Sequence, residues 1–182
     1  MKKLLILLTI ISLISCKEKH NESIIGIQFK DFREINQLAN FKKISDTSFY
    51  LSDSEPKYSL LRLNNKEKDL VIYSNIWHDS DGQRIYKVLD TLSFSKFDKN
   101  EKVTIGYCEI DIKNKVNENI IALVENIDST EMFVKRIKEA WVANPLSEKI
   151  EPIKDIDKVD CFNEWYVGEE TKIDYNLLDE KQ

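Results

Sequence analysis

Glycine, histidine and cysteine are scarce in this sequence, and each shortage excludes a kind of site. Its four glycines cannot supply the phosphate-binding loops Gly-x-x-x-x-Gly-Lys or Gly-x-Gly-x-x-Gly, and neither pattern occurs. Of its two histidines, His20 lies in a polar stretch near the N-terminus, so a catalytic triad would depend on His78. No Gly-x-Ser-x-Gly elbow accompanies that histidine. The sequence therefore favours a non-enzymatic role and predicts neither a cofactor nor a metal site.

Clustered basic residues are also missing. The chain has 27 basic and 32 acidic residues, a formal net charge of −5, and the acids are scattered along it. Nucleic acids and anionic lipid headgroups are bound by clustered basic faces, so neither is an expected partner. A carboxylate pair with glycosidase chemistry stays open, because such pairs are defined by their distance in space.

One long apolar run is present, at the N-terminus. It extends over Leu4–Ile14 and follows the two cations Lys2 and Lys3. Eleven residues in a helix rise roughly 16 Å, about half the hydrocarbon thickness of a bilayer. The run therefore predicts a secretory signal and not a permanent membrane span.

The end of this run, Leu13-Ile14-Ser15-Cys16, resembles the bacterial lipobox. The resemblance implies that the Cys16 thiol receives a diacylglycerol, that the signal is removed before it, and that the new amino group is acylated, for example with palmitate. Two or more acyl chains give a stable membrane anchor. The expected organisation is a signal peptide over residues 1–15, a lipidated cysteine and flexible tether over 16–23, and one globular domain with a frayed acidic tail over 24–182. The alternative is an ordinary signal that leaves Cys16 as a structural thiol.

The tether Lys17–Ser23 is polar and has no apolar periodicity. Its charges loosely resemble the sorting signals of Bacteroidota lipoproteins, which implies attachment to the outer membrane. The sequence leaves open whether the domain faces the periplasm or the cell surface.

Alternating and β-branched segments dominate the rest of the chain. Two capping-box patterns, Asp31 with Glu34 and Asp128 with Glu131, predict short helices over about residues 31–41 and 129–138. The fold class expected is α+β, with a mostly antiparallel sheet built from hairpins and one or two short helices. The alternative is an all-β lipocalin-like barrel. We expect strands at about residues 24–29, 49–51, 58–63, 69–77, 83–89, 92–94, 103–112, 120–124, 141–143 and 149–153.

Two cysteines remain after the lipobox, Cys108 and Cys161. Two thiols in an exported protein predict a disulfide, which would stabilise the fold by roughly 4 kcal/mol in the chain-entropy model. The alternative is two separate buried thiols that pack as small apolar groups.

The sequence offers two weak candidates for a binding site. His78 with Asp79 and Asp81 could ligate a divalent metal, but Asp-Ser-Asp-Gly is also a good turn sequence, and we favour the turn. Trp77, Trp141 and Trp165 could line a groove for a sugar or peptide, although tryptophan more often packs in a core or at its rim.

The segments Lys138–Asn144, Lys149–Ile153 and Val159–Glu164 together resemble the C-terminal part of small uncharacterised Bacteroidota lipoproteins. This resemblance implies a protein class and no activity. Three hypotheses follow for the function. The first is a lipid-anchored, non-enzymatic module that binds a protein or glycan. The others are an inhibitor or immunity-type protein against a basic enzyme, and a carboxylate-dependent envelope hydrolase.

Overall fold

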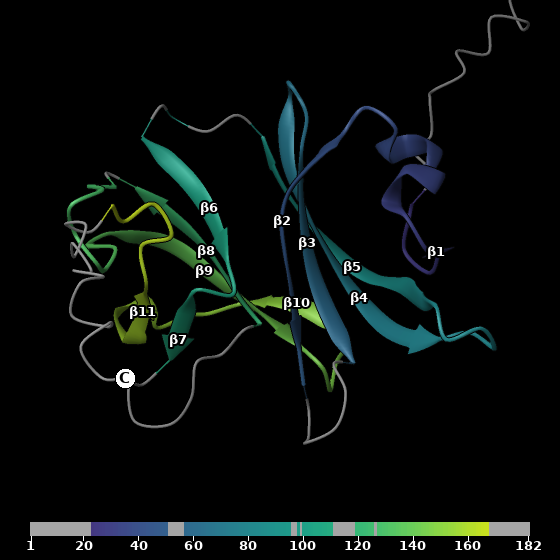
Figure 1. The fold of residues 1–182 in the computed structure, drawn as a ribbon. Helices are drawn as coiled ribbons and strands as arrows, with labels where there is room; N and C mark the ends of the chain where they lie inside the picture. The colour runs from purple at the N-terminus through teal and green to yellow at the C-terminus, as the bar shows by residue number, and fades with distance from the viewer. Residues whose placement is uncertain are drawn as a thin grey trace, which may run out of the picture.

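The computed structural model describes residues 23–50, 57–95, 98, 100–110, 119–125 and 127–167. Their strands form two antiparallel sheets packed face to face, with a two-stranded ribbon beside the second sheet (Figure 1). The first sheet has the order β1-β5-β4-β3-β2 and contains β1 (Gln28–Phe29), β2 (Lys42–Phe49), β3 (Tyr58–Asn64), β4 (Lys68–His78) and β5 (Arg84–Ser95). The second has the order β10-β9-β8-β6 and contains β6 (Glu101–Ile105), β8 (Ile120–Glu125), β9 (Ile137–Asn144) and β10 (Lys149–Pro152). The ribbon pairs β7 (Cys108–Ile110) with β11 (Val159–Cys161).

Both sheets are covered on both faces. In β4, Val71 and Tyr73 point into the space between the sheets, whereas Leu70 and Ile72 point outward into a second cluster. The apolar strand β8 divides in the same way between the sandwich core and an outer cluster. Buried faces on both sides explain why these strands read as continuous apolar runs and not as alternation.

Two outer layers complete the molecule. The N-terminal layer, residues 24–41, covers the first sheet with the buried side chains of Phe29, Phe32, Ile35, Leu38 and Phe41. The ribbon layer consists of β7, β11 and the flanking residues 127–134 and 153–167, and it covers the second sheet. The order in space is therefore N-terminal layer, first sheet, second sheet, ribbon layer, as Figure 1 shows.

The expected helix over residues 31–41 is wrong. Asp31 does cap a turn, because its carboxylate accepts the Arg33 N–H at 2.9 Å. The segment forms only two 3-10 turns, η1 (Phe32–Glu34) and η2 (Asn36–Leu38), separated by the extended Ile35. Its buried side chains, at positions 32, 35, 38 and 41, recur every three residues, which suits the three-residue turn of a 3-10 helix better than the 3.6 of an α-helix.

The second expected helix, over residues 129–138, is also wrong. Phe133 lies in an isolated antiparallel bridge with Phe162, and β9 has already begun at Ile137. The fold class is corrected accordingly: the described residues form an almost entirely β structure with open sheets, so neither the α+β class nor the closed lipocalin-like barrel is right. A third 3-10 turn is η3 (Ile156–Lys158), and no helix in the described part of the chain is long and apolar enough to cross a bilayer.

A buried ion pair joins the two sheets. Arg62 of β3 donates to the Asp69 carboxylate of β4 at 2.7 Å, and the same guanidinium donates to the Val103 carbonyl of β6. Asn64 donates to the second carboxylate oxygen of Asp69. The Asp69 side chain is 1% exposed and that of Arg62 is 11% exposed, so solvent cannot replace either partner.

We expect Asp69→Asn to lower the free energy of unfolding by roughly 3–5 kcal/mol, because it removes the carboxylate that pairs with the largely buried Arg62 guanidinium. Urea unfolding followed by tryptophan fluorescence measures the change. The matched control is Asp46→Asn, which breaks the exposed pair with Lys43 and should cost less than about 1 kcal/mol. Equal losses in the two variants would contradict a special role for the buried pair.

Candidate functional site

The residues singled out in the sequence do not converge on one site. Trp141 lies on β9 at the sandwich core, where its ring meets Phe94 edge to face at 5.3 Å. Trp165 packs against the apolar cluster under the ribbon layer. Trp77 and His78 lie at the end of β4, paired with the start of β5. The proposed lipid site Cys16 lies outside the described residues.

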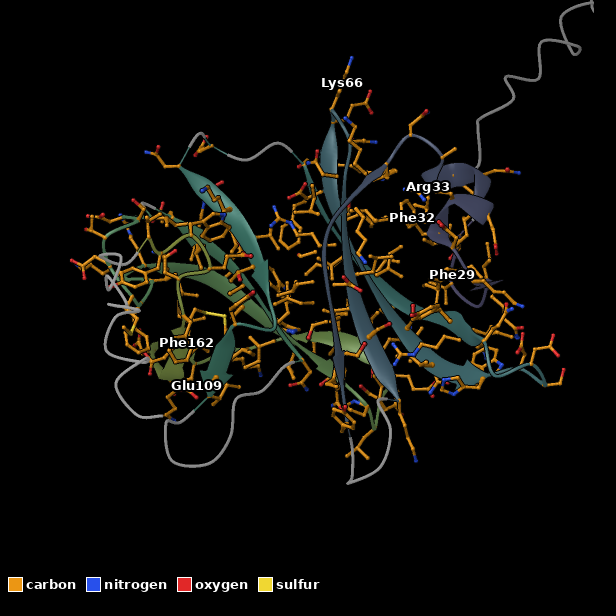
Figure 2. The ribbon with its side chains drawn as sticks, in the orientation of Figure 1. Phe29, Phe32, Arg33, Lys66, Glu109 and Phe162 are labelled. Atoms are coloured by element: carbon orange, nitrogen blue, oxygen red, sulfur yellow. A yellow bond between two sulfur atoms is a disulfide. The ribbon has the colours of Figure 1, made fainter. Side chains whose placement is uncertain are left out.

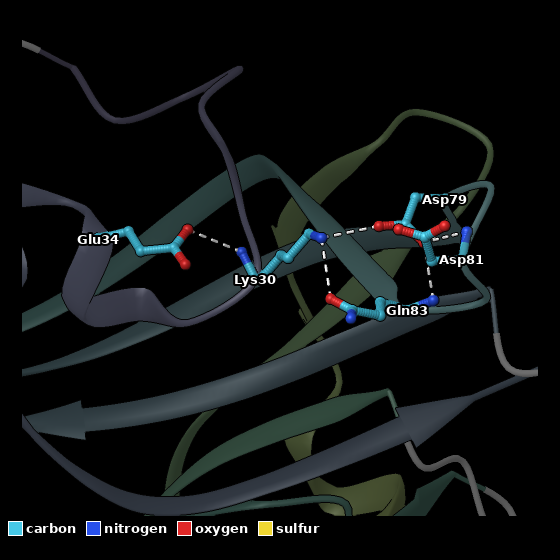
Figure 3. A network of polar contacts seen from close by, with 5 residues as sticks. All are labelled: Lys30, Glu34, Asp79, Asp81 and Gln83. Carbon is cyan, nitrogen blue, oxygen red and sulfur yellow. Dashed lines mark hydrogen bonds and ion pairs between the residues drawn. The ribbon is translucent and has the colours of Figure 1, made fainter.

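The Asp-Ser-Asp-Gly segment, residues 79–82, forms a turn in which the Asp79 carboxylate accepts three hydrogen bonds (Figure 3). One oxygen of Asp79 accepts the N–H groups of Asp81 and Gln83 at 3.0 and 2.9 Å. The other oxygen accepts the Lys30 ammonium at 2.8 Å, and this hydrogen bond is the main reason why the pKa of Asp79 lies below its usual range. The turn therefore connects the N-terminal layer to the β4–β5 hairpin, and within the described residues no three acidic, histidine or cysteine side chains gather as a metal site.

A hollow of about 210 Å³ lies between the N-terminal layer and strands β2 and β3. Phe29 stacks on Tyr86 at 5.3 Å along its wall, and Figure 2 shows Phe29, Phe32 and Arg33 grouped in this layer. The three cations that line the hollow each lie in an ion pair: Lys30 with Asp79, Arg33 with Asp31 and Lys43 with Asp46. Its charged groups satisfy one another, so the lining does not select a ligand of one charge.

The outward face of the ribbon carries a different arrangement. Cys161 lies opposite Cys108, and the register continues to Phe162 and Tyr107, where the Phe162 N–H donates to the Tyr107 carbonyl at 2.8 Å. Phe133 pairs with Phe162 on the other side, with ring centroids 4.8 Å apart. Side chains directly opposite each other share a face, so Tyr107 lies on the same face as the contacting rings of Phe133 and Phe162. We call these three residues the aromatic row. The exposed fractions of Tyr107, Phe133 and Phe162 are 45%, 47% and 39%.

Covalent and polar contacts hold this row in place. A disulfide joins Cys108 to Cys161 across the two ribbon strands. The buried amide of Asn163 donates to the carbonyls of Asp128 and Glu131, each at 2.8 Å, while its own backbone N–H donates to the carbonyl of Met132 at 2.8 Å. These bonds fasten the segment that carries Phe133 to the segment that carries Phe162.

Two residues after Phe162 in the chain, Glu164 is a partly buried carboxyl group, and its burial raises its pKa. The hydroxyl of Thr104 and the charges of Arg62 and Lys102 act in the opposite direction and do not cancel the effect of burial. Among the described residues, no second carboxyl group influences Glu164. A glycosidase needs two carboxyls with separated roles, and the described residues do not supply a second one beside Glu164.

Sequence reasoning missed the aromatic row because it placed Phe133 on a helix. The alternation in Val159-Asp160-Cys161-Phe162 was a usable signal, since Val159 and Cys161 are buried and Asp160 and Phe162 are exposed. The bridge from Phe162 to Phe133 links positions distant in sequence, and no local pattern marks it.

We expect Glu164→Gln to stabilise the protein at neutral pH and to have little effect in acid. The folded-state pKa is raised above 4.5, so wild-type stability falls as the pH rises through 4.5 toward the folded-state value. The neutral glutamine does not have this loss. Urea midpoints of both proteins at pH values of about 3.5 and 7.5 measure it, and a stabilisation of the same size at both values would contradict the burial of a titrating carboxyl.

Comparisons with known proteins do not supply a function. The chain matches no protein-family model, no curated protein and no solved structure.

Proposed function

We propose that this chain is a lipid-anchored protein of the bacterial cell envelope that binds a partner protein through the aromatic row and catalyses no reaction. The observation that carries the proposal is the order of the layers. The layer that follows the tether and the layer that bears the row are the two opposite outer layers of the molecule (Figure 1).

This order has a consequence at the membrane. The seven residues Lys17–Ser23 can extend no more than roughly 25 Å. A lipid on Cys16 therefore keeps the N-terminal layer close to the bilayer. Layers packed about 10 Å apart put the ribbon layer roughly 30 Å farther out. Anchoring at one end thus leaves the aromatic row accessible to a partner in the surrounding compartment.

The carboxyl groups favour binding over hydrolysis. Asp31 and Asp46, which line the hollow, are exposed and paired with Arg33 and Lys43. A catalytic carboxyl has to be free to contact the substrate, and both of these carboxylates already contact cations. Glu164, whose pKa is raised, does not line the hollow, and no acidic group among the described residues influences it.

Cys16→Ser should move the protein from the membrane fraction to the soluble fraction, because it removes the thiol that receives the lipid. Fractionation of cells grown with labelled palmitate measures both location and acylation. The neighbouring variant Ser15→Ala, at a permissive lipobox position, should remain membrane-bound and labelled. Full membrane retention of Cys16→Ser would contradict the anchor.

Partner binding through the row predicts a position-specific crosslink in intact cells. A photoreactive benzoylphenylalanine replacing Phe133, which is 47% exposed, should give one discrete protein adduct after irradiation. The same replacement of Ile44 on β2, which is 51% exposed, should give none. Adducts at both positions or at neither would count against recognition by the ribbon layer.

A further inference from the structure

We infer that the partner of the ribbon layer is a cationic protein surface with an apolar side chain at its centre. This inference rests on the proposed function and names the chemistry of its partner. Two features of the outward ribbon face carry it, one apolar and one electrostatic.

The apolar feature is the concentration of exposed large side chains. Ten large apolar residues are exposed in the described part of the chain, and six belong to the ribbon layer or directly precede β7: Tyr107, Met132, Phe133, Phe162, Tyr166 and Val167. Single exposed apolar residues are common, but a contiguous group marks a contact surface. Aromatic side chains are also the ones that dominate the binding energy at protein interfaces.

The electrostatic feature is a pair of acids next to the aromatic row. Glu109 of β7 lies directly opposite Asp160 of β11, one position beyond the disulfide, and Figure 2 shows Glu109 beside Phe162. Like charges directly opposite on a sheet destabilise it. Neither carboxylate forms an ion pair with any described residue. The two acids therefore do not stabilise the fold through ion pairs with described residues, whereas a cationic partner would neutralise both charges.

Nearby cations do not compensate these acids. Lys135 donates to Glu131 at 2.6 Å, and Lys158 donates to Asp155 at 2.8 Å. Because Glu109 and Asp160 lie in no ion pair with a described residue, they make the described part of this face acidic. A complementary positive surface would gain both association rate and specificity from it.

The same charges argue against the other occupants. An anionic lipid surface or a nucleic acid would be repelled by Glu109 and Asp160. A second copy of this chain, docked face to face around a two-fold axis, would bring four acids together. The chain as a whole also carries a net charge of −5.

The outward ribbon face is held in one conformation in the unbound protein. The disulfide fixes β7 against β11, and Asn163 fixes the segment that carries Phe133. A surface that is already ordered loses little conformational entropy on association.

The test measures fluorescence anisotropy with a labelled peptide in which lysine alternates with leucine and tryptophan. The intact protein is used in a non-ionic detergent, at about 20 and 200 mM salt. We expect the peptide to bind and its affinity to fall at the higher salt. A matched peptide with glutamate in place of lysine should not bind.

Glu109→Gln/Asp160→Asn should weaken the lysine peptide by roughly fivefold to twentyfold at low salt. The variant removes a like-charge contact, so its unfolding midpoint should not fall. The control Glu67→Gln/Asp81→Asn makes the same change in net charge at two exposed turns of the first sheet and should bind like wild type. Equal weakening in the two variants would mean attraction by net charge alone and would overturn the inference.

Two further outcomes would also overturn it: no binding of the lysine peptide at low salt, or equal binding of the glutamate peptide. The crosslink from position 133 separates this failure from failure of the proposed function. If the peptides fail while the adduct forms, the partner exists and is not cationic. If both fail, the ribbon layer is not a recognition surface.

Discussion

Burial on both faces of each sheet is the constraint on which this fold depends. Strands β4 and β8 carry apolar side chains in both directions, so packing the two sheets together satisfies only one face of each. The remaining faces have to be covered by the ends of the domain. The N-terminal residues cover the first sheet with 3-10 turns, and the C-terminal residues cover the second with a disulfide-linked ribbon. Burial of apolar surface thus sends the two ends of the domain to opposite sides of the molecule.

Strands with a strong apolar signal could be predicted from the sequence. The expected segments 58–63, 69–77 and 120–124 match β3, β4 and β8 closely. Strand β2 was largely missed, because an edge strand with one polar, solvated side has a weak pattern. The expected strand over 103–112 is broken at Gly106, which has φ +76°. A Cβ atom at this position would lie only 3.0 Å from Cγ2 of Thr47. Only glycine fits that position easily, and the break lets the chain leave the second sheet for the ribbon.

The candidate site could be predicted only in part. The disulfide could be predicted by counting cysteines in a chain whose sequence predicts export, and its partners face each other in the ribbon register. The aromatic row depends on Phe133 meeting Phe162, a contact that forms only after the second sheet has been covered. The tryptophans were candidates for lining a binding groove because of their large aromatic side chains. Trp141 and Trp165 instead pack against apolar clusters. Large aromatic side chains serve packing and recognition equally well, and only their exposure in the fold distinguishes the two uses.

The contrast between the buried ion pair and the acids of the ribbon also favours recognition at the aromatic row. Inside, the fold tolerates Asp69 because Arg62 and Asn64 donate to its oxygens, and the Val103 carbonyl accepts a further guanidinium N–H. The charge of this pair is thus partnered, as its desolvation demands. Outside, Glu109 and Asp160 stand opposite each other on a rigid ribbon with no described counter-ion. Arg62 and Asp69 are held in place by each other, whereas the half-buried Glu109 and the exposed Asp160 have no described counter-ion. Their uncompensated charge lies beside the aromatic row, which is where a partner with positive charge gains most.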